Sequence, residues 1–214
     1  MIVEICGLPG IGKSTVTKPF IDSKNIYGLR DCLGKRFYNN KKRDIIKFLY
    51  PKHLPKDYNE IISFLNNYPQ CDEKFKDRLL FLYEALKRND NSDKFFLLEE
   101  GAVQHITSLP HDMDISHDNT AEPVIDKLLA KEDAIIYFEA PIDMVYERIQ
   151  KRNRSGDRFL DSNTDSAYKL LEIKKKNIES CLSKYTGRIY RLDMTSSANQ
   201  CSDELAKIIK LING

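Results

Sequence analysis

The fold is decided by the stretch Gly7-Leu8-Pro9-Gly10-Ile11-Gly12-Lys13-Ser14. It matches without exception the pattern of a glycine, four further residues and then Gly-Lys-Ser. The β-branched run at residues 2–6 predicts a strand before it, and a helix is expected from about Lys13. In such a turn, glycines let backbone N–H groups wrap around a polyphosphate where side chains would clash. The stretch therefore predicts a loop that binds a nucleoside triphosphate.

Two side chains of this loop have chemical roles. Lys13 would supply an ammonium group to the β- and γ-phosphates, and the Ser14 hydroxyl would ligate the Mg²⁺ that bridges them. Thr15 is expected to help hold the α-phosphate, and the helix N-terminus adds positive potential. The predicted nucleotide-binding residues are Gly7, Leu8, Pro9, Gly10, Ile11, Gly12, Lys13, Ser14 and Thr15.

Apolar runs of strand length recur after the loop, at residues 95–98, 134–138 and 189–192, with a short candidate strand near 25–29. Stretches with helical spacing of apolar residues separate them, including a long region at about 40–90. This alternation predicts an α/β fold with a parallel sheet covered by helices. At 214 residues, one domain spanning 1–214 is expected.

Composition excludes several classes of protein. Hydrophobic residues at 41% and charged residues at 31%, with no long apolar run, predict no membrane span. The net charge of +2 is a near balance that gives no reason to expect nucleic acid as a partner. The start lacks the features of a secretory signal, so the cytoplasm is the expected compartment. Five scattered cysteines form no Cys-x-x-Cys pair and are expected to be reduced thiols.

Two carboxylates, Glu99 and Glu100, end the predicted strand at 95–98. Ligands collect at the carboxyl edge of an open α/β sheet, so both are site candidates. One could orient Mg²⁺ while the other accepts the proton of an attacking hydroxyl. For either residue taken singly, the alternative is a cap or salt bridge to a neighbouring helix.

Four arginines, Arg148, Arg152, Arg154 and Arg158, gather after the strand at 134–138. Arginines on a mobile segment stabilise the charge that spreads during phosphoryl transfer and exclude water. The last three of these arginines therefore predict a lid at about 150–160. A solvated helix face is the alternative explanation of such a charge run.

Other patterns speak against competing functions. The Asn-Lys-x-Asp motif of GTPases is absent, and the Asp-x-x-Gly at 31–34 does not follow a convincing apolar strand. The spacing of the His and Asp residues at 111–118 fits no standard metal-binding motif. We interpret this segment as a polar loop that could lie over the molecule that accepts the phosphate.

With these motifs in hand, the chain resembles the P-loop kinases of the thymidylate kinase and deoxynucleoside kinase group. Residues 78–88 and then 95–101 look like that group's helix and Asp-Arg strand, and residues 140–158 are similar to its fourth strand and lid. The resemblance implies a P-loop NTPase three-layer sandwich: a five-stranded parallel sheet, helices on both faces and an Arg-rich lid. It also implies ATP as donor, Mg²⁺ as cofactor and lid arginines among the catalytic groups.

The chain departs from that group at one informative position. Where thymidylate kinases carry Asp-Arg, this chain has Glu99-Glu100, so an acid replaces the arginine that would hold the phosphate of the acceptor. We therefore expect a kinase whose small-molecule acceptor, a nucleoside or another compound, presents a hydroxyl group. Arg30 and Glu100 are candidates to line the acceptor pocket.

Two alternative functions and two further questions stay open at this point. The chain could be a nucleoside monophosphate kinase, or an ATPase or nucleotide-regulated protein with no small acceptor. The identity of the base among Glu99 and Glu100 is not decided by the sequence, and a homodimer is a candidate assembly.

Overall fold

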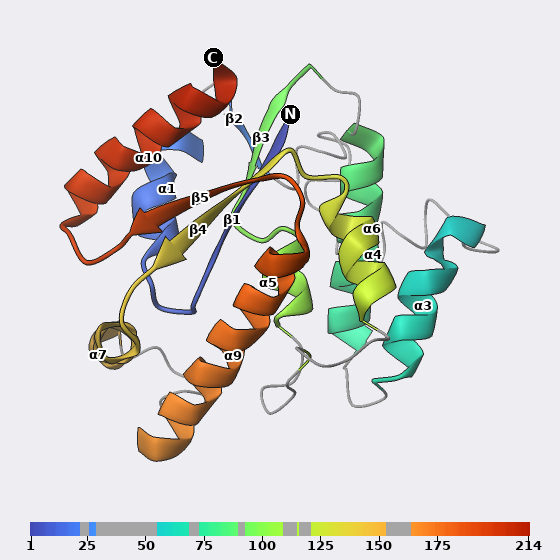
Figure 1. Cartoon of the computed structure of the whole chain (residues 1–214), viewed down its shortest axis with the longest axis horizontal. Helices are drawn as coiled ribbons and strands as arrows, with labels where there is room; N and C mark the ends of the chain where they lie inside the picture. Colours follow the sequence, from blue (N-terminus) through green and yellow to red (C-terminus); the bar gives the residue numbers. More distant parts are fainter. Residues whose placement is uncertain are drawn as a thin grey trace.

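The computed structural model describes residues 1–21, 26–28, 55–68, 73–89, 93–108, 115, 121–152 and 164–214. Within these residues, parallel strands form one sheet in the order β2-β3-β1-β4-β5 (Figure 1). They are β1 (Ile2–Gly7), β2 (Ile26–Tyr27), β3 (Phe95–Leu98), β4 (Ala134–Glu139) and β5 (Arg188–Asp193). The predicted parallel α/β sheet is confirmed, and each predicted strand segment is present.

The strand that precedes the loop, β1, lies at the centre of the sheet. Val3 pairs with Leu97 of β3 on one side and with Ala134 of β4 on the other. All residues of β1 are buried, which is why it is apolar almost throughout rather than alternating. Because β1 and β3 are parallel neighbours, the segments that follow them emerge at the same edge of the sheet.

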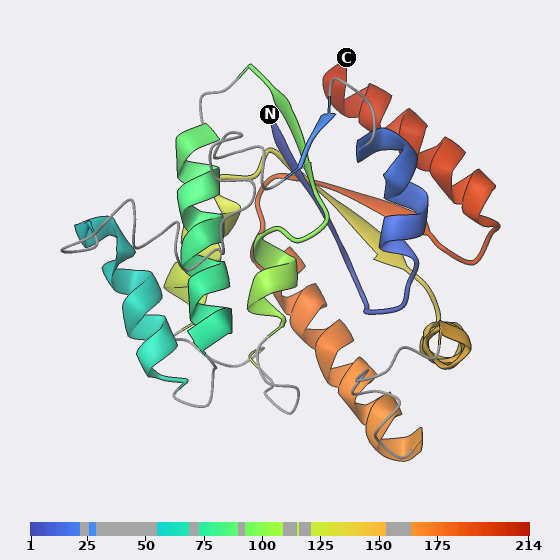
Figure 2. The ribbon, with the colours of Figure 1, turned by 180° about the vertical axis from the view of Figure 1, so that it is seen from behind.

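Helices cover both faces of this sheet (Figures 1 and 2). On one face, α1 (Lys13–Ile21) and α10 (Ala198–Asn213) pack together. On the other, α5 (Ala102–Ile106) and α9 (Thr164–Lys184) contact β1. The other α-helices in the described residues are α3 (Asn59–Asn66), α4 (Glu73–Asn89), α6 (Glu122–Leu129) and α7 (Ile142–Arg152). No helix in the described ranges is both long and apolar enough to span a membrane.

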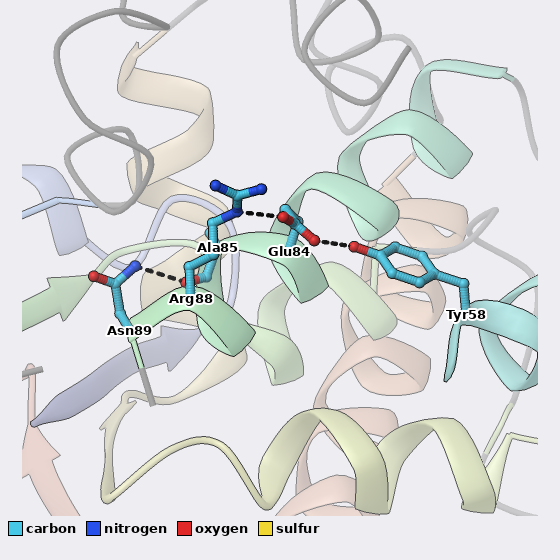
Figure 3. A network of polar contacts seen from close by, with 5 residues as sticks. All are labelled: Tyr58, Glu84, Ala85, Arg88 and Asn89. Carbon is cyan, nitrogen blue, oxygen red and sulfur yellow. Dashed lines mark hydrogen bonds and ion pairs between the residues drawn. The ribbon is translucent and has the colours of Figure 1, made fainter. Parts of the chain in front are cut away.

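A buried polar network fixes α4 against the short 3₁₀ helix η3 (Lys56–Tyr58). The Tyr58 hydroxyl and Arg88 Nε each donate a hydrogen bond to the Glu84 carboxylate (Figure 3). Glu84 is 1% exposed, so these two donors offset the cost of burying its charge. The network holds α4 in place, and the first turns of α4 border the site described below.

The C-terminal end of α4 is closed by a contact of its own last residue. Asn89 Nδ2 donates to Ala85 O at 2.8 Å (Figure 3). Of the predicted helical region at 40–90, residues 55–68 and 73–89 are described and are largely helical, and the rest lies outside the described residues.

Candidate active site

The phosphate-binding stretch forms the predicted turn between β1 and α1. Gly10 has φ 81°, and a Cβ there would lie 2.4 Å from Ile149 Cγ1 on α7. Gly12 has φ 105°, a conformation that side chains disfavour. These two positions therefore require glycine, for the contact with α7 and for the backbone of the turn. The loop shape that the sequence pattern predicts is present.

Lys13 folds back over this loop. Its Nζ donates to Gly7 O at 2.8 Å and to Leu8 O at 3.4 Å. Burial lowers the pKa of Lys13 to about 8, although Glu4, Glu99 and Glu100 oppose the shift. A bound polyphosphate would add negative charge beside the ammonium and favour its charged form. Lys13 is thus a desolvated cation that a polyphosphate would stabilise further.

Residues of the first turns of α1 connect the loop to the edge of the sheet. Ser14 and Thr15 are exposed at the start of the helix. Thr17 is fully buried, and its hydroxyl donates a hydrogen bond to Glu99 Oε1. Nothing in the sequence points to Thr17, because its partner is 82 residues away along the chain.

Glu99 and Glu100 come directly after β3, as predicted, and face the same cleft as Lys13 and Ser14. Glu99 is half-buried and Glu100 is exposed. The carboxylates therefore differ in environment: one is held by Thr17, and the other lies closer to solvent. This difference suits the two separate tasks that the sequence suggested for the pair.

Two further glutamates hold the segment after Glu100, and the sequence analysis missed both. Glu4 Oε2 accepts from Val103 N at 2.9 Å, and its Oε1 accepts from Gln104 N at 2.8 Å. Glu132 Oε1 accepts from Ala102 N at 2.9 Å. A charged residue inside the buried run Ile2-Val3-Glu4-Ile5 was the available signal, since an acid in such a strand needs donors.

These glutamates also contact each other. Burial raises the pKa of both, and the neighbouring Glu4 carboxylate raises that of Glu132 further. The contact with Glu132 and the two backbone N–H groups that Glu4 accepts oppose the rise at Glu4, whereas one backbone N–H group opposes it at Glu132. The pair forms a buried anchor for the start of α5.

The arginine-rich segment contributes in two different ways. Arg148 Nη1 donates to Ile11 O at 2.9 Å and its Nη2 donates to Met194 O at 2.8 Å. This side chain ties the phosphate loop to the segment after β5. Arg152, the last residue of α7, lines the cleft. Arg154, Arg158 and Arg30, together with most of the predicted lid, lie outside the described residues.

A cleft of about 710 Å³ contains these groups. The loop and the first turn of α1, residues 8–16, form its floor, while Gly7 gives its carbonyl to Lys13. Its other lining residues come from α4, from the two carboxylates after β3 and from α5, and also from α7 and the segment that leads into α10. The lining residues away from the floor are Phe75, Arg78, Glu99, Glu100, Gln104, His105 and Ser108, and then Arg148, Arg152, Met194, Ser196, Ala198 and Cys201.

The donors available in the cleft fit a magnesium ion bound together with phosphate. Among the described residues, no three His, Cys, Asp or Glu side chains gather as a metal site. The oxygens of Ser14 and Glu99 would hold only part of a coordination sphere. Magnesium commonly takes one or two protein oxygens and completes its shell with phosphate oxygens and water. The residue types are therefore compatible with Mg²⁺ that arrives with a nucleotide.

Solved structures with the same fold include a kinase. The chain is similar to deoxyadenosine kinase from M. mycoides, in a structure with the products dCMP and a flexible dCDP bound. The two sequences are 17% identical, the match covers 98% of this chain and 99% of that chain, and the TM-score is 0.58. A structure of deoxyadenosine kinase from M. mycoides with bound dATP gives 15% identity, coverage of 98% and 100%, and a TM-score of 0.55. No protein-family model matches the chain, and no curated protein matches it. The chain therefore has the fold of the P-loop small-molecule kinases, as the order of its motifs predicts.

Proposed function

We propose that this chain is a kinase that transfers the γ-phosphoryl group of ATP to a hydroxyl group of a small molecule. The observation that carries the proposal is the meeting of Lys13 and Ser14 with Glu99 and Glu100 in one cleft. A phosphate-binding loop alone serves motors and switches as well. A transferase also needs a group that activates the acceptor, and the carboxylates beside the loop supply one.

On the donor side, the loop amides and Lys13 bind the triphosphate. The Lys13 ammonium stabilises the negative charge that builds up on the β- and γ-phosphates during transfer. Ser14 and Glu99 would hold Mg²⁺, which would neutralise phosphate charge. Arg152 approaches from α7, and Arg154 and Arg158 are proposed to complete an arginine lid at about 150–160.

On the acceptor side, Glu100 acts as the general base. The acceptor oxygen forms a bond to the γ-phosphorus, the bond from that phosphorus to the bridging oxygen of ADP breaks, and the hydroxyl proton passes to the Glu100 carboxylate. Glu100 is the more exposed of the two carboxylates that line the cleft, which makes it the more accessible to an acceptor. Arg30 and residues of 40–90 are proposed to complete the acceptor pocket.

The charge of the cleft favours a hydroxyl over a phosphate as the attacking group. Glu99 and Glu100 stand side by side at the end of β3, where a second phosphate group would meet two negative charges. One observation supports the alternative of a nucleoside monophosphate acceptor: Arg78 of α4 lines the same side of the cleft. An acceptor panel has to contain both classes.

The test is ADP release from ATP and Mg²⁺ with and without a panel of acceptors. It includes thymidine, 2′-deoxyadenosine, 2′-deoxycytidine, their 5′-monophosphates, glucose, myo-inositol and kanamycin, with mass spectrometry of products. We expect a phosphorylated product from an unphosphorylated compound. Lys13→Met should reduce its formation by about 10²-fold or more, because the variant loses charge stabilisation in the transition state. Phosphorylation of monophosphates alone would support the alternative, and ADP release independent of every acceptor would indicate an ATPase.

A further inference from the structure

Gln104 lines the cleft but has no role in the reaction proposed above. It lies on α5, four residues after Glu100, and its backbone N–H donates to Glu4 Oε1 at 2.8 Å. The other end of α5 is held as well, because the buried Lys174 of α9 donates through Nζ to Thr107 O at 2.7 Å. Gln104 therefore extends from a short helix that is fixed at both ends.

Close packing behind this helix leaves it little freedom to shift. A Cβ on Gly101 would lie 2.6 Å from Glu4 Cδ and 2.7 Å from Glu132 Oε1. The backbone at Gly101 thus rests directly against the two buried carboxyl groups. Groups that bind ligands with specificity are usually supported in this way by a second layer of contacts.

The carboxamide of Gln104 has an unmet hydrogen-bonding need. Its Oε1 is buried, and no residue in the described part of the chain donates a hydrogen bond to it. Buried side-chain oxygens usually have a partner in native proteins. At the wall of a cleft, a small rotation of this long side chain would let a ligand supply the donor.

We infer that Gln104 recognises the acceptor by accepting a hydrogen bond from a second hydroxyl or amino group of that molecule, distinct from the hydroxyl that is phosphorylated. The inference rests on the proposed function. It narrows the acceptor to an uncharged compound with at least two hydrogen-bond donors, such as a nucleoside or a sugar. A simple monoalcohol would meet the base but leave Gln104 without a partner.

The variant for the test is Gln104→Met, which keeps the length of the side chain and removes the amide. Its matched control is Gln150→Met, which makes the same change at an exposed position of α7 that does not line the cleft. Steady-state kinetics use whichever compound of the panel the wild type phosphorylates. For Gln104→Met we expect the acceptor KM to rise about tenfold, with kcat within about threefold and the KM for ATP unchanged.

Analogues of that compound, each lacking one hydroxyl or amino group other than the phosphorylated one, separate recognition from structure. In the wild type, one analogue should raise KM about tenfold, and Gln104→Met should no longer distinguish that analogue from the parent compound. An unchanged acceptor KM in Gln104→Met, or a parallel rise in the KM for ATP, overturns the inference and leaves the proposed function standing.

The remaining outcomes are also decisive. If Gln104→Met does not fold, the analogues measured with the wild type still test the inference. The inference is overturned if no analogue raises the acceptor KM of the wild type. If the wild type phosphorylates no unphosphorylated compound of the panel, the proposed function fails and the inference fails with it.

Discussion

Thr17, in α1, donates a hydrogen bond to Glu99, the first residue after β3. The bond joins the helix that begins in the phosphate-binding loop to the strand end that carries the carboxylates. Thr17 is fully buried and Glu99 is half-buried, so the bond is partly shielded from water. The Thr17 hydroxyl thereby fixes the orientation of the Glu99 carboxylate. Carboxylates that bind metal ions are commonly oriented in this way by hydrogen bonds from residues that do not contact the metal.

Replacing Thr17 by Val should weaken magnesium binding in the presence of ATP. The side chain keeps its shape but loses the donor, so Glu99 is no longer held, and the Mg²⁺ concentration needed for half-maximal activity should rise about 10- to 100-fold. Stability should fall by about 1 kcal/mol. Magnesium titrations of ADP release measure the effect, with the exposed Thr186→Val as control. An unchanged magnesium requirement would mean that Glu99 does not bind the magnesium ion.

Local patterns made the donor half of the site predictable. The glycines, Lys13 and Ser14 are consecutive, and their roles follow from the geometry of one turn between a strand and a helix. The position of Glu99 and Glu100 followed from a second local feature, a buried strand that ends in acids. Because parallel strands end at one edge, these two local features were enough to bring the four groups together.

Long-range partners made the rest unpredictable. Arg148 received no role from the sequence beyond its place in a run of four arginines, yet its hydrogen bonds go to the carbonyls of Ile11 and Met194, which are 137 and 46 residues away. Glu4 reaches amides about 100 residues away. No spacing within the sequence encodes such pairs. They arise from the strand order, which places β1 between β3 and β4 and so brings Glu4 beside α5.

Lys13 should give the free protein a distinctive dependence of stability on pH. Burial lowers its pKa from 10.5 to about 8, so between pH 8 and 10.5 the unfolded chain binds more protons at this site than the folded chain. The contribution of Lys13 to the free energy of unfolding therefore rises with pH across that window. The buried Cys6 thiol, whose pKa is raised, acts in the opposite direction, so a difference between variants is needed.

That difference is measured by urea unfolding of wild type and Lys13→Met without nucleotide, at pH 7, 8, 9 and 10. The wild type should gain stability relative to the variant as the pH rises above 8. Lys18→Met, at an exposed position of the same helix, is the matched control. A difference that stays constant with pH would show that the Lys13 ammonium is not desolvated in the free loop.

The buried pair of Glu4 and Glu132 should respond unequally to the same substitution. Glu4 uses both oxygens to accept backbone N–H groups, so Glu4→Gln would direct an NH₂ group at a donor and leave an amide unpaired. We expect a loss of about 1–3 kcal/mol in the free energy of unfolding. Glu132 accepts one N–H through Oε1, and burial together with the neighbouring Glu4 carboxylate raises its pKa, which favours the neutral form.

Glu132→Gln should therefore retain the bond from Ala102 N and lose only the titration of the carboxyl group. A raised pKa means that protonated Glu132 stabilises the fold at acid pH, and that this contribution is lost as the pH rises towards the folded-state pKa. The variant should match the wild type at low pH and exceed it in stability as the pH rises. Chemical unfolding of both variants between pH 5 and 9, with the exposed Glu172→Gln as control, measures these effects. Equal losses of stability from Glu4→Gln and Glu132→Gln would contradict this prediction. They would mean that the negative charge is not concentrated on Glu4, and that both carboxyl groups hold the amides of α5 equally.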